Sequence, residues 1–204
     1  MAIKSTMQSL VALVLLVVAT STLAKAKDDG SQIQASNFYP RVKFVTTMGD
    51  IIVELDRNRA PITVNNFLRY VDKRSYEDTI FHRIVPEFVI QGGGYDTDFI
   101  EKPSFAAIFN ESGNGLKNKM YNITMARKND PHSATRQFFF NMNNNDSLDP
   151  GRDWGYTVFG SVQEGYEVLD KMAEVKTDFD PKYGWSDVPV EQIILKKVII
   201  LPPI

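Results

Sequence analysis

The stretch FHRIVPEFVIQGGG, residues 81–94, places one arginine and one amide among apolar residues that favour a β-strand. Without polar partners, Arg83 and Gln91 would be costly to bury in such a strand. An arginine is charged at every physiological pH, so it can stabilise developing charge but cannot act as a general base. Two interpretations are open: a core arginine paired with an acid, or a fixed cation in a site whose chemistry needs no proton transfer.

Few other residues are candidates for catalysis or metal binding. His82 and His132 are the only histidines, and neither has the spacing of a catalytic triad or a metal site, so a structural or surface role is favoured for each. The chain has no cysteine, which excludes thiol catalysis and cysteine-ligated metals. The glycines of residues 92–94 lack a phosphate-loop pattern. The sequence therefore predicts neither a metal nor a cofactor.

Residues 1–26 have the pattern of a cleaved secretory signal peptide. An early lysine, Lys4, precedes an apolar run over residues 10–19, and Ala24-Lys25-Ala26 matches a cleavage site. The alternative is a retained N-terminal membrane anchor, for which the run is short. Asp and Glu together number 25 against 23 Lys and Arg, so no excess of positive charge predicts binding to nucleic acid or to an anionic membrane surface.

The remaining sequence predicts many short strands and two helices. Residues 27–38 are polar and are expected to form a flexible lead-in. Two alternating runs flank Met48-Gly49-Asp50 as a hairpin, and Pro61 opens a helix with an apolar stripe. One or two strands are expected around Pro86, further strands at 122–126, 137–141, 156–162 and 191–201, a helix at 164–175, and loops at 92–120 and 142–155.

This inventory predicts the fold class. A doubly wound α/β fold needs a helix after nearly every strand, and the chain has too few. A closed or nearly closed β-barrel whose ends are covered by two helices fits better. No internal repeat or linker divides the sequence, so one domain is expected.

Three motifs in order carry a family resemblance. FHRIVPEFVIQGGG, MARKNDPHSATRQFFFN and LDPGRDWGYTVFGSVQEGYEVLDKM resemble the cyclophilin family of peptidyl-prolyl isomerases, and exported bacterial cyclophilins most closely. The resemblance runs from Val42 to Leu201. It implies a mainly β fold, an eight-stranded antiparallel β-barrel capped by two α-helices, over a domain at 39–204. It also implies a peptide-binding groove on the outside of the barrel.

The resemblance also implies a role for particular residues. Arg83 matches the catalytic arginine of the family. The positions that match the pocket for the substrate proline ring are Phe88, Val89, Phe139, Leu148 and Tyr156. The positions that match the rest of the groove and bind the peptide backbone are Gln91, Ala126, Arg127 and Gln137.

The implied activity is cis-trans isomerisation of X-Pro bonds, during the folding of exported proteins. The expected partners are proline-containing segments of unfolded exported proteins, with no nucleic acid, no stable membrane insertion after cleavage, and a monomeric enzyme. The periplasm is the expected location, with secretion or a eukaryotic secretory pathway as the alternative. A second functional hypothesis is a non-catalytic module or chaperone with the same fold that binds proline-containing segments.

Arg136 departs from the family pattern, in which a small serine often precedes the glutamine of QFF. One hypothesis is that Arg136, near Arg127, makes a secondary pocket of the groove basic and favours acidic residues before the substrate proline. The alternative is that Arg136 points to solvent.

Overall fold

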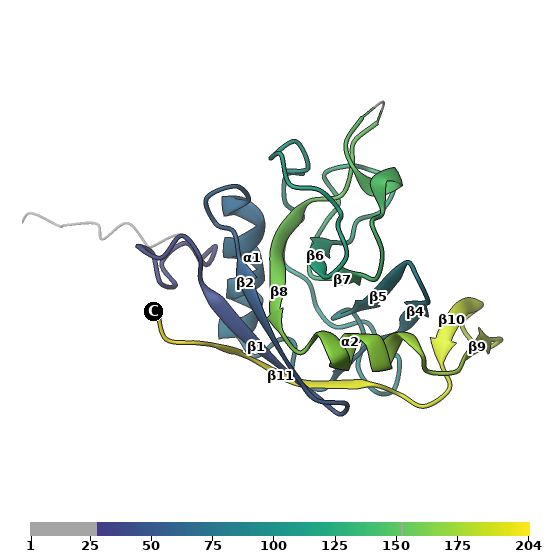
Figure 1. The fold of residues 1–204 in the computed structure, drawn as a ribbon. Helices are drawn as coiled ribbons and strands as arrows, with labels where there is room; N and C mark the ends of the chain where they lie inside the picture. The colour runs from purple at the N-terminus through teal and green to yellow at the C-terminus, as the bar shows by residue number, and fades with distance from the viewer. Residues whose placement is uncertain (1–27, 152) are drawn as a thin grey trace, which may run out of the picture.

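A computed structural model describes residues 28–151 and 153–204. The predicted signal peptide lies outside these residues. Nine antiparallel strands form one curled sheet (Figure 1). In spatial order they are β3 (Thr79–Ile80), β11 (Ile194–Ile200), β1 (Arg41–Thr46), β2 (Asp50–Leu55), β8 (Val158–Glu164), β6 (Asn122–Met125), β7 (Phe138–Asn141), β5 (Val89–Gly92) and β4 (Arg83–Val85).

The mainly β class with two helices is confirmed, and the strand count differs in detail from the expected eight. The ninth strand of the sheet is β3, a two-residue segment paired with the edge of β11. A separate ribbon consists of β9 (Thr177–Asp180) and β10 (Trp185–Pro189). The sequence did not predict this ribbon because most of its side chains are exposed or half-buried and show no apolar alternation.

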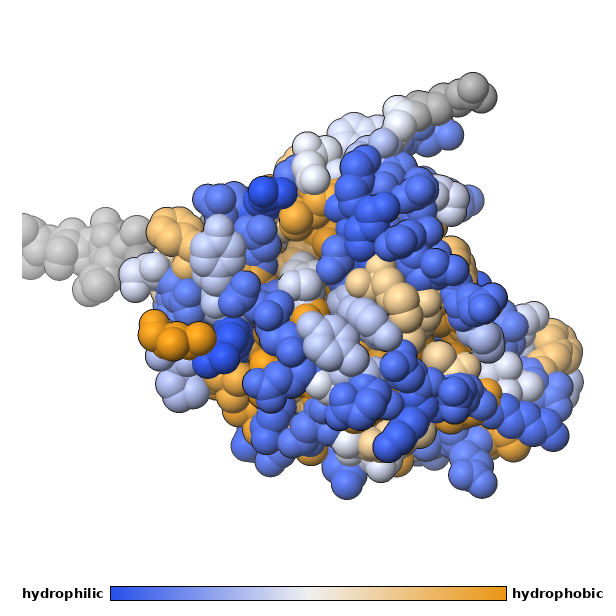
Figure 2. All heavy atoms as spheres, viewed as in Figure 1, coloured by the Kyte–Doolittle hydropathy of each residue, from blue (hydrophilic) through white to orange (hydrophobic). Residues whose placement is uncertain are grey.

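The strands follow from alternating side chains. In β1, Val42 and Phe44 are fully buried whereas Arg41 and Lys43 are only partly covered, the period of two that a sheet with one core face requires. β1 pairs with β2 across the predicted turn, where Gly49 has a φ of +140°. This face-by-face sorting leaves the surface in Figure 2 mainly hydrophilic, with apolar side chains showing between polar ones.

Two helices pack on the sheet: α1 (Pro61–Asp72) contacts β11, and α2 (Tyr166–Ala173) contacts β2, β4 and β5. Pro61 begins α1 as predicted, and a distant side chain caps it, because the Glu111 carboxylate accepts hydrogen bonds from the Thr63 backbone N–H and hydroxyl. Gly165 precedes α2 with a φ of +89°, and a Cβ there would lie 2.4 Å from the Asp50 carbonyl oxygen. Only glycine fits that corner.

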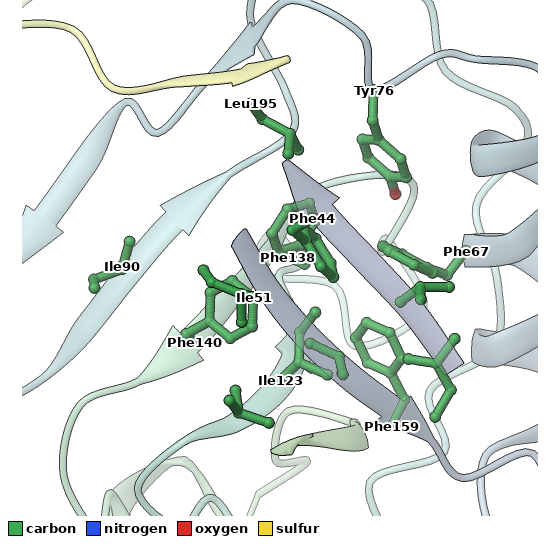
Figure 3. Packing of buried hydrophobic residues seen from close by; sticks show 14 of the residues in the cluster. Phe44, Ile51, Phe67, Tyr76, Ile90, Ile123, Phe138, Phe140, Phe159 and Leu195 are labelled. Atoms are coloured by element: carbon green, nitrogen blue, oxygen red, sulfur yellow. The ribbon is translucent and has the colours of Figure 1, made fainter. Parts of the chain in front are cut away.

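The core is aromatic. Phe44 and Phe138 lie at its centre, and their rings meet edge to face with centroids 5.4 Å apart (Figure 3). Phe67 from α1, Phe140 from β7 and Phe159 from β8 surround them and are fully buried. Such offset contacts add to the stabilisation that comes from removing these rings from water. This core joins α1 to both halves of the sheet.

The predicted lead-in is anchored rather than free where the structure describes it. Residues 28–38 form turns, and the buried guanidinium of Arg57 donates to the carbonyl oxygens of Ile33, Gln34 and Asn37 at 2.6–2.9 Å. These bonds tie the segment to the end of β2. No helix within 28–151 and 153–204 has the length and hydropathy needed to cross a bilayer.

An aromatic cluster joins the β9–β10 ribbon to the sheet beside β4. His82, 8% exposed, lies edge-on to Tyr95 with centroids 4.9 Å apart, and Trp185 from β10 packs against both rings. Burial, and after it the neighbouring Arg83 charge, lower the pKa of His82 to about 4. His82 is therefore neutral at pH 7 and belongs to the fold, which agrees with the structural role that the sequence favoured.

This low pKa predicts a pH-dependent loss of stability. In the unfolded chain His82 binds a proton below about pH 6.5, whereas in the folded chain it does so only near pH 4. Its contribution is therefore complete above pH 6.5 and declines as the pH falls through 4, by about 3 kcal/mol in all. Urea unfolding of wild type and His82→Gln at a series of pH values should show a steeper acid decline in wild type. Parallel curves would contradict the assignment, and His132→Gln serves as the control.

Candidate active site

The outer face of the sheet carries a cavity of about 120 Å³. Nine of the ten predicted site residues line it: Arg83, Phe88, Val89, Gln91, Ala126, Arg127, Phe139, Leu148 and Tyr156. The tenth, Gln137, lines an adjoining pocket of about 220 Å³. Gln91, Ala126 and Arg127 line both, so the two pockets are continuous. The sequence motifs, spread over some 70 positions, are thus gathered into one groove.

Strand register places the polar residues on the outer face. Arg83 in β4 lies opposite Gln91 in β5, and Gln91 lies opposite Phe139 in β7. Their immediate neighbours Ile90 and Phe140 point the other way and are fully buried in the core. Because side chains alternate between the faces of a strand, the same apolar stretch can supply both the core and the groove. This alternation explains why Arg83 and Gln91 stand among buried residues in the sequence.

The opposite wall of the cavity comes from the loop after β7. Leu148 lies in a 3₁₀ turn (Asp146–Leu148), and its carbonyl oxygen accepts a hydrogen bond from the Tyr156 N–H. Asn145 donates from its amide to the Phe88 carbonyl oxygen at 2.9 Å and to Asn141 Oδ1 at 2.7 Å. These bonds fasten the loop to Phe88, in the turn before β5, and to Asn141 at the end of β7. The aromatic and apolar walls are therefore fixed in place before any ligand arrives.

A buried polar network lies behind this loop. Asn118 donates to the Asp149 carboxylate from its backbone and its side chain, at 2.8 and 3.0 Å, and its amide oxygen accepts from the Thr124 hydroxyl. Burial alone would raise the pKa of Asp149, but these hydrogen bonds and the nearby Lys117 ammonium lower it below its usual value. Asp149 is therefore a charged anchor for the segment between Leu148 and Tyr156.

Arg83 lies at the edge of the cavity and is accessible. Its side chain is 38% exposed, its Cζ lies 6.0 Å from the centroid of the Phe88 ring, and its Nε lies 3.8 Å from Oδ2 of Asp187. The structure bears on the first interpretation of the sequence, a core arginine paired with an acid. The arginine has an acidic partner, but the pair lies at the mouth of a cavity and not in the core.

Arg127 is held by the protein itself. Its guanidinium donates to the carbonyl oxygens of Trp154, at 2.6 Å, and Gly155, at 3.2 Å, and its Cζ lies 4.4 Å from the Tyr156 ring centroid. The side chain acts as a wall that supports Tyr156. Beside it, the Gln91 amide N–H donates a hydrogen bond to Gln137 Oε1 at 2.9 Å. The two glutamine side chains therefore form a continuous polar side of the groove.

Both interpretations of Arg136 are wrong. Arg136 lines neither pocket and is only 2% exposed. Its guanidinium donates to the carbonyl oxygens of Gly93, at 2.7 Å, Pro103, at 2.8 Å, and Ser75. The physical reason is that Gln137 faces the groove, so the residue before it points inward. Arg136 fastens three loops together, and the adjoining pocket instead carries Glu101 and Lys128.

Two residues of this neighbourhood were missed by the sequence analysis. Asp187 follows Arg83 by more than 100 positions, and Asn145 lies in a run of asparagines with no periodic pattern. Pairings between distant positions leave no local signal, so only the fold reveals them. The turn chemistry of residues 142–155 indicated a loop but not which of its amides would reach Phe88.

The inventory limits the chemistry. Within 28–151 and 153–204 no three acidic or histidine side chains gather into a metal site. His82 is buried and neutral, and His132 Nδ1 accepts a hydrogen bond from the Asn110 N–H. The groove formed by the two pockets offers an accessible cation, aromatic walls and two amides. Such a site has the shape and polarity to accommodate a small apolar ring with a polar backbone on either side.

Comparison with known proteins agrees with this geometry. A family model described as cyclophilin type peptidyl-prolyl cis-trans isomerase/CLD matches residues 41–199. The peptidyl-prolyl cis-trans isomerase cyp18 of Streptomyces antibioticus is 46% identical over 164 residues, which cover 78% of this chain and 98% of that protein. A peptidyl-prolyl cis-trans isomerase of Acinetobacter baylyi is 48% identical over 161 residues, which cover 78% of this chain and 84% of that protein.

A solved structure shares the fold. The cyclophilin type isomerase of Cryptosporidium parvum, crystallised in the presence of the dipeptide Ala-Pro, has a TM-score of 0.62 and 26% identity, over 80% of this chain and 99% of that one. The family model covers both helices, all ten groove residues and the curled sheet except for Ile200, the last residue of β11. The chain belongs to the cyclophilin-type peptidyl-prolyl cis-trans isomerase family.

Proposed function

We propose that the chain catalyses X-Pro isomerisation with Arg83 as the catalytic residue and the 120 Å³ cavity as the proline pocket. The observation that carries the proposal is an accessible guanidinium at the mouth of a slot walled by Phe88, Phe139 and Tyr156. The slot is of a size for one small ring, and with a proline ring inside it Arg83 would meet the bond that precedes the ring.

The reaction requires only that the twisted bond be favoured. Rotation about a peptide bond meets a barrier of about 18–20 kcal/mol, because the C–N bond is partly double. In the twisted state the proline nitrogen becomes pyramidal and its lone pair localises. A guanidinium N–H can donate to that lone pair, and a hydrogen bond from a charged donor contributes about 1.5–3 kcal/mol. Because this bond forms only in the twisted state, it accelerates the reaction and does not merely tighten binding.

The rest of the groove would hold the peptide while one bond turns. Phe139, 4% exposed, and Tyr156 meet edge to face, with centroids 5.9 Å apart, and form a fixed wall for the ring. Gln91 and Gln137 offer amide donors and acceptors for the peptide backbone next to the proline. Preorganised partners of this kind need no rearrangement during the reaction.

The setting of the activity is also a proposal. The signal-peptide pattern of residues 1–26 supports export, with the periplasm as the location and unfolded exported proteins as substrates. N-terminal sequencing of the protein recovered from the exported fraction should start near Lys27. A chain that still begins at Met1 would instead support the membrane-anchor alternative.

Replacement of Arg83 tests the proposal most simply. Arg83→Ala should lower kcat/KM for a proline-containing tetrapeptide by about 10- to 100-fold or more, which corresponds to the loss of one charge-assisted hydrogen bond. Isomerisation is followed by a conformer-selective protease or by NMR, and circular dichroism checks the fold. Arg59→Ala, which removes an arginine 50% exposed beside Asp56, is the matched control and should retain full activity.

The result also separates catalysis from binding alone. A wild-type protein that binds the peptide without accelerating its isomerisation would support the non-catalytic module. An Arg83→Ala protein with unchanged turnover would remove Arg83 from the mechanism.

The rate should be independent of pH over the neutral range. An arginine side chain is charged throughout this range, and His82, with a pKa of about 4, stays neutral. For a peptide without titrating side chains, kcat/KM should vary by less than about 2-fold between pH 6.5 and 9. A bell-shaped profile with a tenfold amplitude would indicate a general acid or base and would contradict the mechanism.

A further inference from the structure

The β9–β10 ribbon contains a bulge at the residue that faces Arg83. Trp185 pairs with Asp180 and Val188 pairs with Asp178, so one extra residue stands between the two pairs on β10. Asp187 lies in this bulge and has a φ of +63°, in the left-handed region that most residues avoid. Bulges of this kind turn a side chain away from its regular direction and are frequent beside functional sites.

The ribbon is held firmly enough to position that side chain. The Trp185 ring packs against Tyr95, with centroids 4.7 Å apart, and against Tyr183, with centroids 5.2 Å apart. Val188 and Pro189, which follow the bulge, are buried. β10 packs beside β4, the strand that carries Arg83, and Figure 1 shows the ribbon at that end of the sheet. The bulge is therefore fixed on both sides.

The contact involves one edge of the guanidinium. Asp187 Oδ2 lies 3.8 Å from Nε of Arg83, and the side chains are 40% and 38% exposed. Among the residues that the structure describes, Asp187 is the acid paired with Arg83, and neither Nη1 nor Nη2 makes a hydrogen bond to the protein. The carboxylate therefore engages the inner nitrogen and leaves the terminal N–H groups for a ligand.

We propose that Asp187 is a positioning residue that orients the guanidinium of Arg83 for the isomerisation; this inference rests on the proposed function. An arginine side chain has many rotamers, and a half-exposed one loses that freedom when it must donate to a twisted bond. A fixed carboxylate at Nε restricts the rotamers beforehand. It does so without occupying the N–H groups that meet the substrate.

Stability alone does not account for the arrangement. A pair at 3.8 Å whose partners are both more than a third exposed contributes little to folding, since water screens it. Yet the chain maintains an unfavourable backbone conformation at Asp187. Strain retained beside a functional group is expected when it serves the mechanism. His82, the other titratable neighbour of Arg83, is neutral and does not compete for the guanidinium.

Asp187→Asn tests the proposal cleanly, because asparagine has nearly the same shape and tolerates a positive φ. We expect kcat to fall about 5- to 20-fold, with KM for a tetrapeptide changed less than about 2-fold and the unfolding midpoint within about 2 °C of wild type. Asp187→Gly, which also accepts the backbone conformation, should show the same loss. Asp178→Asn, an exposed acid of the same ribbon, is the matched control and should leave kcat unchanged.

A double-mutant cycle distinguishes positioning from a direct role. In an Arg83→Lys background, which lacks the guanidinium Nε, Asp187→Asn should lower kcat less than about 2-fold further, because the group that it orients is gone. An equal loss in both backgrounds, or no loss in wild type, would overturn the proposal.

The Arg83 side chain gives a readout that does not depend on turnover. In ¹⁵N NMR, the Nε–H group of Arg83 should show greater motion in Asp187→Asn than in wild type. In Asp178→Asn its motion should equal that in wild type. An unchanged signal in Asp187→Asn would also overturn the proposal. If wild type fails to isomerise peptides but its Nε–H signal responds to Asp187→Asn, the pairing stands and the proposed function is what fails.

Discussion

The register between β4, β5 and β7 is the constraint on which the rest of the structure depends. It places Arg83, Gln91 and Phe139 side by side on the outer face while Ile90 and Phe140 enter the core. A slip of one residue would exchange the two faces. It would bury a charge and expose the aromatic centre of the molecule. The large apolar area buried by the inner side chains therefore fixes the groove as firmly as it fixes the core.

The groove is supported from behind by polar groups that do not meet the ligand. Asn145 ties the loop to Phe88, and the charged Asp149 fastens the segment that carries Tyr156. Arg136 joins three loops beside the second pocket. Without these hydrogen bonds, the apolar walls of the groove would pack against each other and close it. A site of this kind has its geometry before the peptide binds, which is what stabilising a short-lived twisted state requires.

Local patterns predicted most of the elements and, through the family motifs, the residues of the groove. The β1–β2 hairpin, both helices and the strands around Pro86 follow from alternation, helical spacing and turn residues within a few positions of each other. What the sequence could not show are contacts between distant positions. The direction of Arg136 depends on which neighbour faces the groove, and the pairing of Arg83 with Asp187 depends on a ribbon with no apolar alternation. The anchored lead-in likewise depends on Arg57, some 20 positions away.

The central claim is that a non-titrating cation beside an apolar slot favours the distorted midpoint of the X-Pro bond. Exchange spectroscopy on a bound Ala-Pro peptide measures the cis-trans interconversion rate on the enzyme directly, apart from binding and release. With Arg83 replaced by glutamine, the account predicts that this rate falls at least about tenfold while peptide affinity changes little, because the lost bond exists only in the twisted state. An on-enzyme rate equal to that of wild type would contradict the account.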